Sequence, residues 1–216
     1  MANPEHVAVV RQGTGAVDVW RSTNPGAQLD LREADVHSSD LFDADLSGAI
    51  LHDAFLASAN LDLANLTGAD LTGANLVGAS LRRADLTKAR LSRANLESAD
   101  LSGANLSNAF LTRSRLVMTG LSGALLTQAS IARAVLHQTD LVHTRFTDTV
   151  CFETLFCRVD LSTAIDLHIV DHRGPSTIGS DSIYASQGRI PSVFLRGCGL
   201  SDLEILAAKL HAGARA

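Results

Sequence analysis

Two histidines near the C-terminal end have a spacing that can hold a metal ion. His168 and His172 are four residues apart, which places two imidazoles on one face of an α-helix. However, the intervening Ile169 and Val170 favour a strand, and Gly-Pro follows at once at positions 174 and 175. Asp166 and Asp171 are the only nearby candidates for a third ligand. We therefore predict no metal site.

The three cysteines offer little chemistry. Cys151, Cys157 and Cys198 form no C-x-x-C pair and leave one residue over, so a disulfide framework is not expected and a reducing cytoplasm suits them. None has a histidine or other base arranged to activate it. No phosphate-cradling glycine loop occurs either. The sequence thus predicts no catalytic residue, no cofactor and no enzyme.

Charged residues are the most suggestive group. Positions 29–163 contain 16 acids and 11 bases, and three of the bases follow one another at equal intervals, namely Arg93, Arg113 and Arg133. The net charge of −5 and the pI of about 5.9 give no general affinity for nucleic acid or an anionic membrane. No run of 18 apolar residues is present to span a bilayer.

These residues belong to a repeat of period five. A large apolar residue, called position i below, occurs at residue 31 and at every fifth residue to 161, and 22 of these 27 positions are Leu. Position i−2 is mostly Ala. A period of five spirals round an α-helix and alternates between the two faces of a strand, so neither element buries all the leucines. Because turn residues such as Ser-Gly and Thr-Gly recur at i+1 and i+2, we expect the chain to bend once per repeat and wrap round an axis.

The motif A-(D/N)-L-x-x carries a family resemblance. It recurs as Ala69-Asp70-Leu71, Ala74-Asn75-Leu76 and Ala94-Asn95-Leu96, and it resembles the pentapeptide-repeat family. The resemblance implies an all-β fold, a right-handed quadrilateral β-helix with four repeats per coil and about seven coils over residues 29–163. Nine Asp and five Asn interchange at position i−1, so we interpret them as side chains that hydrogen-bond the turn backbone.

The ends are expected to close the solenoid. Residues 1–28 are expected to form an N-terminal cap, in which Val7, Val10, Val17 and Trp20 have near-helical spacing broken by glycines. Residues 164–200 are predicted to be a loop-rich closing segment. Residues 201–216 are predicted to be a helix and tail, begun by a Ser201-x-x-Glu204 capping box. Both end segments resemble a bacterial subfamily often linked to signalling or effector modules such as TIR domains. Whether a further domain belongs with this chain is left open.

With four repeats per coil, Arg93, Arg113 and Arg133 would stack on one face. Together with Arg115 and the outward Phe110, they form the candidate partner-binding surface. The competing interpretation is a solvated face neutralised by acids such as Asp53 and Glu153.

The family resemblance and the exposed residues of the repeat lead to two hypotheses for the function. The first hypothesis is a cytoplasmic scaffold that binds a protein partner, and a homodimer is left open. The alternative is a DNA mimic that binds DNA gyrase or another topoisomerase, as some members of the family do. A continuous acidic face would favour mimicry.

Overall fold

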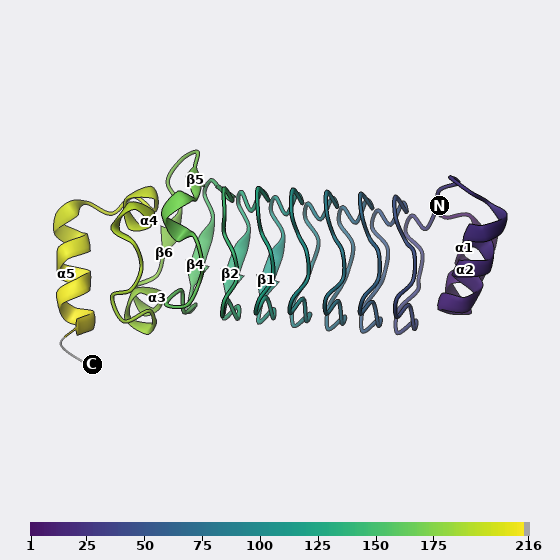
Figure 1. Cartoon of the computed structure of the whole chain (residues 1–216), viewed down its shortest axis with the longest axis horizontal. Coiled ribbons are helices and arrows are strands. Elements are labelled where there is room, and N and C mark those ends of the chain that lie inside the picture. The colour runs from purple at the N-terminus through teal and green to yellow at the C-terminus, as the bar shows by residue number, and fades with distance from the viewer. Residues whose placement is uncertain (214–216) are drawn as a thin grey trace.

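The protein is an elongated rod in the computed structural model, which describes residues 1–213. Two helices close one end of the rod, stacked coils form its length, and a group of short helices closes the other end (Figure 1). The N-terminus lies beside the first coil, and the last helix, α5, lies at the opposite end.

A narrow apolar column fills the coils. Every residue at position i, from Leu31 to Leu161, is at most 1% exposed. The alanines at position i−2 are buried beside them, for example Ala44 and Ala94. Each coil therefore covers the apolar side of its neighbours, which is how a solenoid forms a continuous core.

Backbone pairing joins each repeat to the fourth repeat after it. Parallel bridges run from Asp30↔Ile50 to Arg145↔Ile165, so four repeats complete one coil. Near the C-terminal end these bridges lengthen into strands: β1 (Arg115–Val117), β2 (Val135–His137), β4 (Leu155–Cys157) and β6 (Thr177–Ile178) form one parallel sheet, and β3 (Val150–Cys151) pairs with β5 (Asp171–His172).

The corners between faces have one backbone geometry. Every residue at position i+2 from Glu33 to Arg158 has a positive φ, although only six of these 26 are glycine. All nine Asp and five Asn residues at position i−1 accept a hydrogen bond from the N–H two residues ahead, as Asp45 does from Ser47 at 3.0 Å. This confirms that these side chains support the turns.

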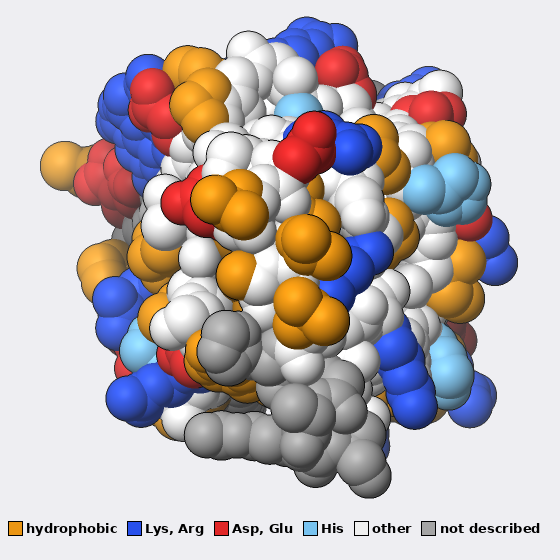
Figure 2. Space-filling view, turned by 90° about the vertical axis from the view of Figure 1, so that its left-hand side faces the viewer, with side chains coloured by type: hydrophobic (Ala, Val, Ile, Leu, Met, Phe, Trp, Pro, Cys, Tyr) orange, Lys and Arg blue, Asp and Glu red, His pale blue; other side chains and the backbone are white. Residues whose placement is uncertain are grey.

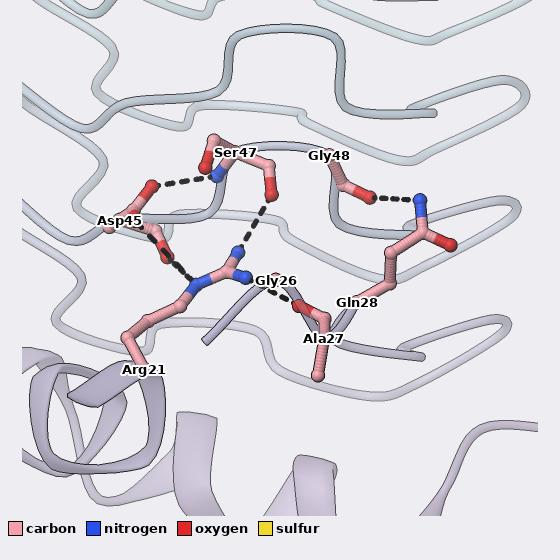
Figure 3. Close-up of a pocket in the computed structure, with 7 residues that line it drawn as sticks. All are labelled: Arg21, Gly26, Ala27, Gln28, Asp45, Ser47 and Gly48. Carbon is pink, nitrogen blue, oxygen red and sulfur yellow. Dashed lines mark hydrogen bonds and ion pairs between the residues drawn. The ribbon is translucent and has the colours of Figure 1, made fainter. Parts of the chain in front are cut away.

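The N-terminal end is closed by α1 (Pro4–Arg11) and α2 (Thr14–Thr23). Trp20 and Val17 are buried against the core. Arg21 donates hydrogen bonds to the carbonyl oxygens of Asp45, Ala27 and Ser47 at 2.7–2.9 Å (Figure 3). A hollow of about 430 Å³ lies round this guanidinium. Because its donors already bind coil carbonyls, Arg21 serves as a cap of the first coil.

The C-terminal coils change their inner residues. Threonine replaces alanine at several i−2 positions, and each buried hydroxyl donates to a carbonyl of the preceding coil, as Thr144 does to Leu121 at 2.8 Å. The other threonines with this bond are Thr119, Thr139, Thr149 and Thr154. A polar side chain is thus buried with its hydrogen bond made.

Residues 164–200 have more regular structure than a loop-rich segment. Winding continues, but the pairing interval grows: Asp171 pairs with Val150 one position beyond the four-repeat interval, and Thr177 pairs with Leu155 two positions beyond it. Three short helical elements lie in this stretch beside β5 and β6: η1 (Leu167–Ile169), α3 (Ser180–Ala185) and α4 (Ser192–Gly197). Phe194 of α4 packs edge-on against Phe156 and His172 and covers the end of the core.

Helix α5 (Asp202–Gly213) is the last element. Ser201 and Glu204 exchange hydrogen bonds at its start, and these bonds hold the pKa of Glu204 below its ordinary value. Leu203, Leu206 and Leu210 are all more than half exposed, and hydrophobic side chains are visible on this end of the rod (Figure 2). The predicted tail, residues 214–216, lies outside the described part of the chain.

Candidate functional site

One corner of the rod carries the candidate arginines. We call it the corner ridge: position i+2 of every fourth repeat, reading Glu33, Asp53, Gly73, Arg93, Arg113, Arg133 and Glu153. The backbone N–H of Arg93 donates to the carbonyl of Thr112, one coil on, and that of Arg113 donates to Ala132, both at 2.9 Å. The ridge residues are therefore held in register by the solenoid, one coil apart.

The three arginines are not equivalent. Arg133 binds Glu153 at 2.7 Å and lies over the ring of Phe152 at 5.2 Å. Arg93 and Arg113 are exposed, and neither makes a side-chain hydrogen bond or ion pair with the side chains that the structure describes, residues 1–210. The two free guanidinium groups keep their donors available for an anionic partner.

Phe110 and Arg115 lie on either side of the ridge. Phe110 is 52% exposed on the face that leads into the corner, where it pairs with Arg90 of the preceding coil. Arg115 lies in β1 on the next face and binds Glu97 at 3.0 Å. The structure thus brings Phe110 and the free arginines to one edge, while Arg115 is engaged within the chain.

Charge is segregated along the rod. Residues 29–70 contain nine acids and one base, whereas residues 71–133 contain eight bases and three acids. Four of these bases are ion-paired, namely Arg82, Arg90, Arg115 and Arg133. Sequence reasoning noted the arginine spacing and placed Asp53 and Glu153 in the same column, but it did not include Glu33. The middle coils consequently form a basic belt, and no single acidic face runs through them.

The cysteines and the two histidines considered above as chemical groups do not form a reactive site. Burial raises the pKa of the Cys151 thiol, and it raises the pKa of Cys198 to about 12, so both stay protonated and unreactive. His168 lies in η1 and His172 in β5, so they do not share a helix. Among the described side chains, which end at residue 210, no group of three His, Cys, Asp or Glu is placed to hold a metal.

His172 is partly buried, and its ring nitrogens are unusual. Both ring nitrogens are shielded from solvent and have no hydrogen-bond partner in the described structure. Gly197 lies directly against the ring, where any larger residue would collide with it. Burial lowers the pKa of His172, so its neutral form is the one that packs beneath α4.

Comparison with known proteins gives a consistent picture. The model of the family described as pentapeptide repeats matches residues 39–78, 79–116 and 121–149. No curated protein matches this chain. Among described residues, no helix is both long and apolar enough to cross a membrane.

Solved structures also resemble this chain. HetL, a pentapeptide repeat protein involved in heterocyst differentiation regulation from Nostoc sp. strain PCC 7120, is 31% identical; the match covers 70% of this chain and 74% of HetL, with a TM-score of 0.34. A trypsin-treated form of QnrB1, a plasmid-mediated fluoroquinolone resistance protein, is 18% identical over 82% of this chain and 90% of its own, with a TM-score of 0.57. A protein of the Arabidopsis thaliana thylakoid lumen is 28% identical over 62% of this chain and 74% of its own, with a TM-score of 0.29.

Proposed function

Because the chain belongs to the pentapeptide-repeat family, whose members are generally structural or interaction modules, we propose that it is a non-enzymatic scaffold. It binds a protein partner through the faces of its right-handed β-helix. The observation that carries this proposal is the pair of free arginines, Arg93 and Arg113, held one coil apart beside the exposed Phe110.

The rigid backbone of the corner ridge favours binding there. The backbone of each ridge residue is fixed by inter-coil hydrogen bonds, so a partner orders only side chains when it binds. Arginine and aromatic residues, including Phe, are enriched at protein interfaces relative to the rest of the surface. The expected partner presents carboxylates to the guanidinium groups and an apolar contact to Phe110.

Arg133 and Arg115 have smaller roles in this proposal. Each is already bound to a glutamate of its own chain, so a partner would have to compete with Glu153 or Glu97. We therefore assign the centre of the site to Arg93, Arg113 and Phe110. The three reduced cysteines fit a cytoplasmic location for the interaction.

The alternative function is a DNA mimic that binds DNA gyrase. It is favoured by the acids of the first coils and by the likeness in fold to QnrB1. Against it, the nine Asp at position i−1 bind turn backbone, and the basic belt interrupts the acidic surface. A gyrase supercoiling assay with a fluoroquinolone tests it: protection or inhibition by this protein supports mimicry, and neither effect rejects it.

Pull-down from lysate with tagged protein tests the scaffold. The variant Arg93→Glu/Arg113→Glu reverses the free charges of the ridge. The control Arg83→Glu/Lys88→Glu reverses two other exposed corner bases that make no ion pair within the described residues. We expect the bound proteins to be lost only with the ridge variant. An unchanged set of bound proteins would remove the ridge as the site.

A further inference from the structure

The corner ridge reverses its charge about Gly73. Asp53 lies one coil before Gly73 and Arg93 one coil after it; Glu33 lies two coils before and Arg113 two coils after. Each coil advances about 4.8 Å, the spacing of paired strands. The ridge therefore carries two acids and two bases at matching distances on either side of a glycine.

We propose that this ridge binds the same ridge of a second copy of the chain, with the two rods antiparallel and a two-fold axis at Gly73. This inference rests on the proposed function and names the partner of the ridge. Asp53 then faces Arg93 of the second copy, and Glu33 faces Arg113 of the second copy. The symmetry makes each ion pair twice, as a two-fold interface requires.

The two ridges match without distortion. Both rods have the same coil spacing, so alignment of one ion pair aligns the others. The residues just before the ridge positions in the central coils are small, namely Thr72, Ser92 and Thr112. No bulky side chain at these positions keeps the two corners apart.

The charged groups are available for a second copy. The side chains of Glu33 and Asp53 are 63% and 55% exposed. Glu33 lies 3.9 Å from the exposed N-terminal amine, and Asp53 lies 3.0 Å from His52, which is charged only when protonated. Such exposed pairs are weak and exchange readily. Arg93 and Arg113 make no competing ion pair in the described structure.

The position of the axis follows from the same contacts. A shift of half a coil would place Glu33 opposite Arg133, which Glu153 already binds at 2.7 Å, and would leave Arg93 facing Gly73. With the axis at Gly73, both free arginines meet an acid. The Arg133–Glu153 pair lies three and four coils from this axis, beyond the acids of the second copy's ridge.

Sedimentation velocity at about 0.01 M and about 1 M salt tests the proposal, because the screening length falls from about 30 Å to about 3 Å. The native protein should dimerise in low salt and dissociate in high salt. Glu33→Arg/Asp53→Arg makes the ridge wholly basic, and Arg93→Glu/Arg113→Glu makes it wholly acidic. Each variant alone should be monomeric, with a dimer Kd raised at least about tenfold, which is about 1.4 kcal/mol. An equal mixture of the two should form the dimer again.

Two control variants test which surface pairs and where the two-fold axis lies. Arg83→Glu/Lys88→Glu changes other corners and should leave the dimer intact, as should Arg133→Glu. A native protein that stays monomeric in low salt at up to about 1 mM, where weak pairing would be visible, overturns the proposal. So does a mixture of the two ridge variants that fails to associate. If native protein is monomeric but the pull-down still depends on Arg93 and Arg113, self-pairing fails and the proposed function stands.

Discussion

Replacement of both free arginines by glycine should stabilise the rod while abolishing binding at the ridge. Arg93 and Arg113 have φ values of 61° and 62°, in the left-handed region where a side chain with a Cβ is strained. Neither forms an ion pair in the described structure that the change would break. The change also removes like charges held one coil apart.

The size of the effect follows from the backbone. Relief of left-handed strain contributes about 1–2 kcal/mol per residue. The greater freedom of glycine in the unfolded chain offsets about 0.4–1 kcal/mol of this. The net gain is about 0.5–1 kcal/mol per site, or about 1–2 kcal/mol for Arg93→Gly/Arg113→Gly. For a chain of this size that corresponds to a Tm higher by about 2–8 °C.

Thermal and urea unfolding measure the gain. The control Arg93→Ser/Arg113→Ser removes the same charges but keeps a Cβ at the strained φ, so it should gain much less. A lower Tm for the glycine variant, or an equal gain in the serine variant, would refute the strain argument. Stabilisation accompanied by loss of binding would show that the ridge is maintained for function.

Other changes probe the two ends and the core. Because burial lowers the folded pKa of His172, the contribution of this residue to stability should be constant above about pH 6.5 and fall below it until the folded pKa is reached. Urea melts should show a smaller loss of stability between neutral and acid pH in His172→Leu than in the native protein. Arg21→Ala removes hydrogen bonds to three carbonyls and should lower the free energy of unfolding by about 1.5–3 kcal/mol. Amide hydrogen exchange should then rise first in residues 30–48, and unchanged exchange there would contradict a capping role. Thr144→Val removes the buried hydrogen bond to the carbonyl of Leu121, which still accepts from the N–H of Ala124. Urea unfolding should show a stability lower by about 1 kcal/mol. An unchanged stability would mean that the hydroxyl does not stabilise the fold.

The coils could be predicted from the sequence because their rule is local. A leucine at every fifth residue can be buried only if the chain bends once per repeat, and the structure buries every such position. Because Asp and Asn interchange at position i−1, the sequence also predicted that these side chains hydrogen-bond the turn backbone. Arg115 and Arg133 show the limit: their pairing with Glu97 and Glu153 depends on side-chain rotamers between coils.

Residues 164–200 could not be predicted in the same way. Once the pairing interval departs from four whole repeats, as it does at Val150↔Asp171 and Leu155↔Thr177, the period no longer says which residues meet. The packing of Phe194 on Phe156 and His172 joins segments with no repeat between them. Tertiary contact alone decides such packing, and composition indicated only loops.

The most direct test of the corner ridge is site-specific photo-crosslinking in intact cells that express the protein. A photoreactive amino acid at Thr112, next to Arg113, should give a discrete adduct with a protein, and an adduct of twice the chain mass would identify a second copy. The matched position Ser122, two repeats later in the same coil and on the opposite corner, should give none. Equal labelling from both positions, or none from Thr112, would contradict the assignment of this ridge as the binding surface.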